Sequence, residues 1–343
     1  LVDTRPGIGG TVPQLDKWFP DNGCELCKLL PVFSRDECTQ LCLRREMAHP
    51  NIELLPYSSL TGLTGEAGNF KATIRLMSRW VKTERCTGCG LCAEVCPVEV
   101  PDEWNDGLTM RKAAYVRHPQ AIPNFYAIDR DACTRCGKCV EVCPTNAIEL
   151  EMKDTNRQLE VGAVIVAAGF QEFDSARLGQ YGFGRFDNVL TNLQVERLLS
   201  SGGRTAGELR RPSDGKVPRR VDFLQCVGSR DAERNYCSTA CCMYALKEAI
   251  LIKEKYPSTE VNIYYMDMRA FGKGYHRYYV KAQEMGINFI RSRVSAIKQH
   301  PRTKSLYLLA RAEDGTLINA ESDIVVLAAA QCPSARTAEL ARI

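Results

Sequence analysis

Eight cysteines of this chain form a repeated pattern that is typical of iron–sulfur ligands. Cys-x2-Cys-x2-Cys-x3-Cys-Pro occurs at residues 86–97 and again at 133–144. In two-cluster ferredoxins with this spacing, three thiolates of one repeat bind one cube and the fourth binds the neighbouring cluster. The alternative, zinc knuckles or buried free thiols, does not require this doubled pattern. We therefore expect two [4Fe–4S] clusters, one held by Cys86, Cys89, Cys92 and Cys143 and the other by Cys133, Cys136, Cys139 and Cys96.

A third group of thiols lies near the start of the chain, in the spacing Cys-x2-Cys-x10-Cys-x3-Cys. Four thiols this close together suit one tetrahedral site, either a [4Fe–4S] cluster or a zinc ion. Beside a ferredoxin-like segment the iron–sulfur interpretation is favoured, with zinc and a role without metal as alternatives. The predicted ligands are Cys24, Cys27, Cys38 and Cys42.

The fourth group of cysteines lies in a segment whose other features are typical of a dinucleotide-binding unit. A strand at Val221–Gln225, a helix at Cys241–Tyr256 and a strand at Val261–Met266 are expected, but the first loop has a single Gly228 in place of Gly-x-Gly-x-x-Gly. The free amides and positive dipole end of the helix would stabilise an anionic cluster as they would a pyrophosphate. We expect a cluster there, with buried structural thiols as the alternative. Its ligands would be Cys226, Cys237, Cys241 and Cys242, which leaves Cys332 as an ordinary buried residue.

Composition limits the classes of protein that remain. The chain has 343 residues, enough for two or three domains, and 17 Cys but only 4 His, which favours thiolate metal ligation in a reducing, cytoplasmic compartment. Each oxidised cluster with its thiolates carries about −2, so four clusters would change the net charge of +4 to about −4. We expect no nucleic-acid partner. No apolar run is long enough for a transmembrane segment, and the chain, which does not begin with Met, is expected to be an internal piece of a longer protein.

Other segments indicate two dinucleotide-binding domains. Leu1–Asp3 resembles the end of a strand whose acidic residue binds ribose hydroxyls, and Gly7–Gly10 follows it. Residues 161–170 are predicted to be a buried strand that ends at Gly169, and residues 322–330 a similar strand. We also expect a meander from residues 51–60 and 69–80, and a hairpin over 306–318 that turns at Asp314-Gly315.

The predicted fold is α/β: a thioredoxin-reductase-like pair of Rossmann-type domains with an inserted α+β ferredoxin domain that carries two [4Fe–4S] clusters. We expect a first part of an FAD-binding domain, lacking its N-terminal Gly-rich loop, then the ferredoxin, the continued FAD domain, a nicotinamide-domain-like unit with a cluster in place of NAD, and a return toward the FAD domain. The corresponding ranges are 1–79, 80–150, 151–215, 216–330 and 331–343.

With these elements placed, the chain resembles the heterodisulfide reductase A-subunit (HdrA) family. The residues that carry the resemblance are "GIGGTVPQLDKWFPDNGCELC", "HPNIELL", "CTGCGLCAEVCPVEVP", "RKAAYVRHPQAIPNFYAID", "QCVGSRD", "YCSTACCMYALKEA" and "YYMDMRAFGKGY". The resemblance implies an FAD-dependent, iron–sulfur electron-transfer protein in which the Cys226 group ligates a cluster and Asp3, Gly9, Gly10 and Gly169 contact FAD. It also suggests that Lys247 reaches the isoalloxazine; a surface lysine on an amphipathic helix is the alternative.

The resemblance implies flavin-based electron bifurcation between a mid-potential donor, a disulfide-reducing partner and ferredoxin. The implied partners are other heterodisulfide reductase-type subunits, a hydrogenase or formate dehydrogenase module, and ferredoxin. A second hypothesis is a non-bifurcating relay in a quinone-linked or aromatic-ring-reducing complex, peripheral to a membrane. An NAD(P)H-dependent enzyme of the thioredoxin-reductase type is a third, although the loop after Leu224 lacks the glycines it needs. A structural zinc scaffold or nucleic-acid module is the weakest.

Overall fold

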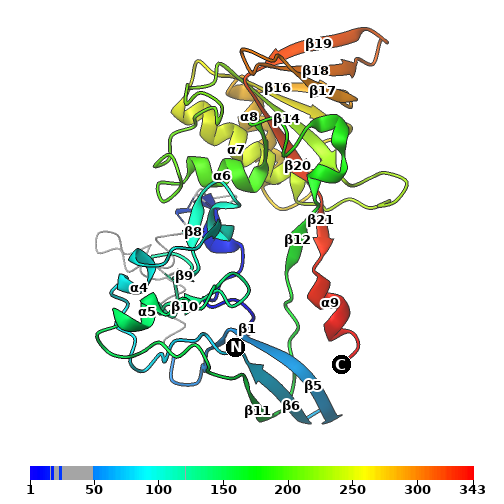
Figure 1. Cartoon of the computed structure of the whole chain (residues 1–343). Helices are drawn as coiled ribbons and strands as arrows, with labels where there is room; N and C mark the ends of the chain where they lie inside the picture. The colour runs from blue at the N-terminus through cyan, green and yellow to red at the C-terminus, as the bar shows by residue number, and fades with distance from the viewer. Residues whose placement is uncertain (16, 19–22, 25–48, 120) are drawn as a thin grey trace. The chain divides into compact units, whose positions relative to one another are not determined.

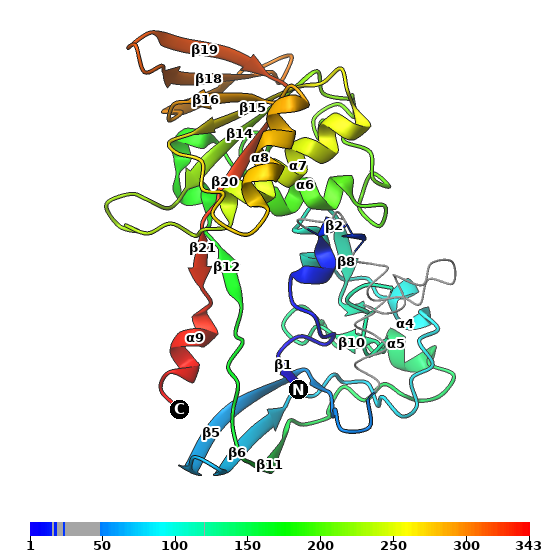
Figure 2. The same cartoon turned by 180° about the vertical axis from the view of Figure 1, so that it is seen from behind.

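The computed structural model describes residues 1–15, 17–18, 23–24, 49–119 and 121–343, which fall into two compact units (Figures 1 and 2). The first unit takes its described residues from Leu1–Gln14, Cys24–Gly169 and Ser334–Ile343, and the second from Leu15–Gly23 and Phe170–Pro333. Within the described ranges, no helix combines the length and apolar character that crossing a bilayer requires.

The second unit is built on a parallel sheet of five strands in the order β13–β20–β14–β15–β16. All six residues of β20 are buried, as expected for a central parallel strand covered on both faces. The predicted strands at 221–225, 261–266 and 322–330 are confirmed. The bounds of the sheet strands are β13 (Val189–Thr191), β14 (Arg220–Val227), β15 (Glu260–Tyr265), β16 (Asn288–Arg291) and β20 (Ile324–Ala329).

Helices and a second sheet cover this parallel sheet. In both views α6 (Asn192–Leu199), α7 (Cys241–Lys255) and α8 (Tyr275–Glu284) lie together (Figures 1 and 2). Alternate residues of β20, Val325 and Leu327, share a core with the antiparallel sheet, so the intervening residues face the helices. That antiparallel sheet has the predicted hairpin, turning at Gly315 with φ 88°. Its strands are β17 (Ala296–Gln299), β18 (Leu306–Arg311) and β19 (Leu317–Ser322).

The first unit contains an antiparallel sheet of β5 (Ser58–Glu66), β6 (Asn69–Leu76) and β11 (Thr155–Val161). The predicted meander is therefore present, with its first strand later than expected. The cysteine repeats lie between β6 and β11, which pair along seven residues. The two ends of the inserted segment also meet, because Val81 bridges Ile148 and the N–H of Lys82 donates to the carbonyl of Ala147 at 2.7 Å.

The remaining elements are short. Next to the cysteines lie α4 (Leu91–Glu94), α5 (Lys138–Glu141), the β7–β8 pair (Glu99–Pro101, Met110–Lys112) and the β9–β10 pair (Ala114–Tyr115, Ala127–Ile128). The others are β1 (Val2–Asp3), β2 (Lys17–Trp18), β3 (Gly23–Cys24), β4 (Leu55–Pro56), β12 (Phe170–Glu172), β21 (Gln331–Pro333) and α9 (Ala335–Leu340).

The predicted buried strand at 161–170 is wrong. Only Val161, the last residue of β11, and Phe170, the first of β12, belong to strands. Ile165 is 93% exposed and Val166 is 59% exposed. An apolar run becomes a buried strand only where neighbouring strands accept its backbone hydrogen bonds. In the part of the chain that the structure describes, no strand pairs with residues 163–169.

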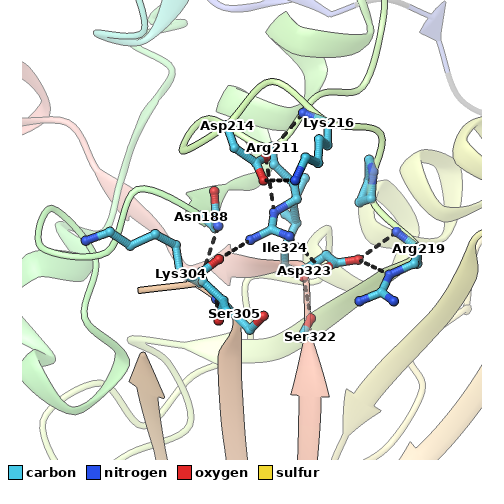
Figure 3. Close-up of polar contacts among 12 residues, drawn as sticks. Asn188, Arg211, Asp214, Lys216, Arg219, Lys304, Ser305, Ser322, Asp323 and Ile324 are labelled. Carbon is cyan, nitrogen blue, oxygen red and sulfur yellow. Dashed lines mark hydrogen bonds and ion pairs between the residues drawn. The ribbon is translucent and has the colours of Figure 1, made fainter. Parts of the chain in front are cut away.

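A buried ion pair ties the loop before β14 to the start of β20 (Figure 3). The Arg211 Nη1 donates to Asp323 Oδ1 at 3.0 Å, and Asp323 Oδ2 accepts the backbone N–H of Arg219 at 2.7 Å. Both charged side chains are buried, at 9% and 4% exposure. Removing one member leaves the other charge in a medium that solvates it poorly.

We expect Arg211→Leu to lower the free energy of unfolding by about 3 kcal/mol, because Asp323 then remains buried with one fewer donor. Urea unfolding followed by circular dichroism measures this loss. Lys216→Gln is the matched control, since the Lys216 side chain is 76% exposed where it pairs with Asp214. Equal midpoints for the two variants would show that the buried pair is not stabilising.

Candidate iron–sulfur sites

Two cavities in the first unit are each lined by four thiols. The first, of about 350 Å³ with the open space at its mouth, also borders Tyr126, and the second measures about 320 Å³ on the same basis. In each, three cysteines come from one sequence repeat and the fourth from the other, so the structure brings together both predicted ligand sets. The thiols are Cys86, Cys89, Cys92 and Cys143 around the first cavity and Cys96, Cys133, Cys136 and Cys139 around the second.

Two glycines allow the chain to turn around these cavities. Gly90 and Gly137 precede α4 and α5 with φ 89° and 81°, the left-handed region that suits glycine. Cys92 and Cys139 follow two residues later, in the first turn of each short helix. The same local turn in both repeats therefore directs the third thiol of each motif inward.

The surroundings of the thiols require a positive charge. Burial, with a contribution from Cys86, raises the pKa of Cys92 to about 12. Burial also acts on Cys143, but hydrogen bonds from Ala147 and Thr145 outweigh it and lower the pKa of that thiol. The N–H of Ala147 lies 3.2 Å from Cys143 Sγ. Bound iron would supply the charge that keeps all four thiolates ionised, with backbone amides as outer hydrogen-bond donors.

The cavities fit a cluster better than a single ion. Of the described residues, no group of three or more His, Cys, Asp or Glu could hold one metal ion. None of the cysteines whose side chains are described forms a disulfide. Four thiols spaced around an open volume suit a cube whose corners they bind, rather than a zinc ion at their centre.

The second unit gathers Cys226, Cys237, Cys241 and Cys242 where β14 ends and α7 begins. All but the half-buried Cys237 are buried. Burial raises the pKa of Cys242 to about 12, and the other three thiols are close enough to add to the rise. The N-cap residue of α7, Ala240, provides no side-chain cap, so the first amides of the helix can face negative charge.

The backbone at Cys226 departs from the strand. Its φ of 61° is left-handed, and the register of β14 against β20 shifts between Leu224 and Val227. The following Gly228 has φ 77°, and a Cβ there would lie 2.2 Å from the ring of Phe173. Such an irregularity bends a strand and changes the direction of its side chains, and here it falls at the first cysteine of the group.

Arginines surround the predicted FAD contacts at the start of the chain. Asp3 accepts the N–H of Arg5 at 2.9 Å, and Arg117 donates to the carbonyl of Gly7 at 2.9 Å and also to that of Gly10. Burial and the neighbouring Arg5 lower the pKa of Arg117 to about 10. The buried Nη1 of Arg79 has no hydrogen-bond partner in the described part of the chain. This excess of positive charge suits an anionic group.

The predicted glycines differ in their surroundings. Gly9 has φ 112°, and a Cβ would meet Pro13 Cγ at 2.7 Å. Gly10 and Gly169 have φ 61° and 66°, and a Cβ at either position would meet no atom within 4 Å. A ligand could therefore approach the backbone at Gly10 and at Gly169.

Lys247 is a buried residue of α7, so the alternative of a surface lysine is wrong. Its side chain is 2% exposed, forms an ion pair with Glu196 of α6, and donates to the carbonyl of Lys17 at 2.9 Å. Burial and Glu196 raise the pKa of the adjacent Glu248, which accepts a hydrogen bond from Asn192 at 2.6 Å. A contact between Lys247 and flavin remains a prediction.

The third predicted cysteine group lies mostly outside the described residues. Cys24 ends β3, whereas Cys27, Cys38 and Cys42 are not described. Iron–sulfur and zinc occupancy of this group therefore both remain predictions.

Comparison with known proteins agrees with this geometry. A model described as a 4Fe-4S dicluster domain matches residues 80–148, which contain all eight thiols of the two cavities. The chain is 48% identical over 97% of its length to an iron-sulfur A-subunit of CoB--CoM heterodisulfide reductase from Methanopyrus kandleri, covering 50% of that protein. It is 46% identical over 100% of its length to the iron-sulfur A-subunit of CoB--CoM heterodisulfide reductase from Methanocaldococcus jannaschii, covering 51% of it.

This chain belongs to the heterodisulfide reductase A-subunit family. Another member, from Methanococcus maripaludis, is named as the A-subunit of an H(2)/formate:CoB-CoM heterodisulfide,ferredoxin reductase and is 45% identical over 100% of the chain and 51% of its own length. The chain therefore spans about half the length of the family members it matches.

Several charged residues that contact the predicted site residues were not predicted from the sequence. Arg117 lies far from the glycines that it contacts, and Glu196 lies far from Lys247, so spacing carried no signal for either. Arg117, Arg230 and Asp267 stand inside the quoted motifs "RKAAYVRHPQAIPNFYAID", "QCVGSRD" and "YYMDMRAFGKGY". Their place in those motifs is a signal that the spacing of the cysteines alone does not contain.

We expect Lys247→Met to destabilise the second unit by about 3 kcal/mol, because Glu196 would lose its buried countercharge. Hydrogen exchange of the α6 and α7 amides measures this loss. Lys281→Met in α8 is the control, since its ion pair with Glu254 is partly exposed and should contribute little. Unchanged exchange in Lys247→Met would contradict a structural role for the buried pair.

Proposed function

We propose that this chain is the cluster-bearing part of an FAD- and [4Fe–4S]-dependent electron-transfer subunit of a heterodisulfide reductase-type complex. The observation that carries the proposal is the pair of cavities lined by four thiols each, with the fourth cysteine exchanged between repeats. Two clusters in neighbouring cavities of one small segment form a path for single electrons. The family members' names support the same function.

The ligand sets follow the cavities. One cluster would be held by Cys86, Cys89, Cys92 and Cys143 and the other by Cys133, Cys136, Cys139 and Cys96. Cys226, Cys237, Cys241 and Cys242 would hold a third at the start of α7. The group of Cys24, Cys27, Cys38 and Cys42 is proposed as a fourth site.

FAD, when bound, would supply the exchange between two-electron and one-electron transfer. Asp3 would hold ribose hydroxyls. Gly9, Gly10 and Gly169 are the proposed backbone contacts of the cofactor, with open space beside Gly10 and Gly169. The uncompensated guanidinium charge of Arg79 and Arg117 supports an anionic diphosphate beside Gly7–Gly10. The domain boundaries after residues 79, 150, 215 and 330 are part of the same proposal.

We further propose that the complete protein takes part in electron bifurcation, with hydrogen or formate as donor and a heterodisulfide and ferredoxin as acceptors. The proposal is supported by the Methanococcus maripaludis family member, which is named for reduction of both heterodisulfide and ferredoxin. Hydrogenase or formate dehydrogenase modules and other heterodisulfide reductase subunits would be its partners.

The exchange of the fourth cysteine predicts a specific pattern of iron loss. In the anaerobically prepared full-length protein, Cys86→Ala combined with Cys143→Ala should lose about four iron atoms, because both thiols serve one cluster. Cys86→Ala combined with Cys96→Ala should lose about eight. Cys332→Ala, outside every predicted set, should lose none. Equal iron loss in the two double variants would contradict the exchanged ligands.

Bifurcation predicts that the two acceptors depend on each other. In the full-length protein assembled with its partner subunits, hydrogen should reduce ferredoxin only while heterodisulfide is present. The measurement is anaerobic absorbance of ferredoxin with and without the disulfide. Equal rates in both conditions would identify a simple relay and overturn the bifurcation proposal.

A further inference from the structure

Three charged residues form a cluster against the thiols of the second unit. Arg230 forms an ion pair with the Asp267 carboxylate, and Arg269 Nε donates to the same carboxylate at 3.1 Å. The Arg230 guanidinium also lies near the Cys226 thiol. The backbone carbonyl of Asp267 lies 3.9 Å from Cys242 Sγ. The charged cluster therefore lies beside Cys226 and Cys242 of the candidate site.

The parallel sheet explains why these residues meet. Arg230 follows β14 and Asp267 follows β15, its hydrogen-bonded neighbour. The carboxyl ends of adjacent parallel strands lie at one edge of the sheet. Arg230 has φ 55°, a left-handed conformation in the loop after β14, and its side chain reaches Asp267.

The charges of the cluster do not cancel. Arg230 and Arg269 carry two positive charges against the single negative charge of Asp267, and the three side chains are partly shielded from solvent, at 26%, 31% and 44% exposure respectively. Cys226, Cys241 and Cys242 are buried. A positive charge near a buried redox centre stabilises its reduced, more negative form, and a negative charge stabilises the oxidised form.

We propose that Arg230 and Asp267 set the reduction potential of the cluster at Cys226, with Arg230 raising the potential and Asp267 lowering it. This inference rests on the proposed ligation of that cluster. Both act as positioning and tuning residues, since neither is a ligand in the proposed set. The Asp267 carboxylate offsets part of the positive charge of Arg230, with which it forms an ion pair.

The test is a redox titration of the full-length protein, followed by electron paramagnetic resonance of the signal that Cys226→Ala removes. Arg230→Gln should lower the midpoint potential and Asp267→Asn should raise it. Each shift should change the oxidised-to-reduced ratio at least tenfold at fixed ambient potential, equivalent to about 59 mV for one electron. Arg230→Lys, which keeps the charge, should stay closer to the unmodified protein than Arg230→Gln does.

Controls separate this inference from the proposed ligation. Lys298→Gln removes one positive charge from an exposed position in β17 and should leave the midpoint unchanged. Shifts of the same sign in Arg230→Gln and Asp267→Asn, or no shift in either, would overturn the inference. If Arg230→Gln fails to retain iron, Asp267→Asn still decides: a raised midpoint supports the inference and an unchanged one overturns it. If Cys226→Ala removes no signal, Cys226 does not ligate a cluster. The proposed ligation and the inference on its potential then both fail.

Discussion

One electrostatic constraint governs the described chain: anionic thiolates must converge in apolar surroundings and still be compensated. The thiols around the two cavities pack against Trp80, Ile128 and Ile148. Buried thiols resist ionisation, so iron, backbone amides and nearby arginines must together supply positive charge. The loops that carry the thiols turn tightly around each cavity at the left-handed Gly90 and Gly137.

The first unit meets the constraint by local repetition. Each repeat places a left-handed glycine before a single helical turn, and each contributes one cysteine to the other's cavity. Since each cavity needs thiols from both halves, neither half can form a complete site by itself. The pairing of β6 with β11 and the bridge between Val81 and Ile148 close the inserted segment at its base.

The second unit meets the same constraint with a different scaffold. A parallel sheet and the start of α7 provide the place where many dinucleotide-binding folds accept phosphate. Here the strand bends at Cys226, α7 starts with two cysteines, and the loops after β14 and β15 supply arginines. A scaffold suited to an anionic nucleotide is equally suited to an anionic cluster.

The sequence by itself determined the eight ferredoxin cysteines, the strands β14, β15 and β20, helix α7 and the hairpin of β18 and β19, because these depend on spacing and short-range periodicity. It also carried the family resemblance. It misjudged residues 161–170, because apolar composition cannot say whether partner strands are present. Only the tertiary structure decided that Lys247 is buried against Glu196 and that Arg230 meets Asp267 beside Cys226. Both ion pairs join residues that are distant in sequence. Their electrostatic energy depends on distances that exist only in the folded chain, so local sequence patterns do not predict it.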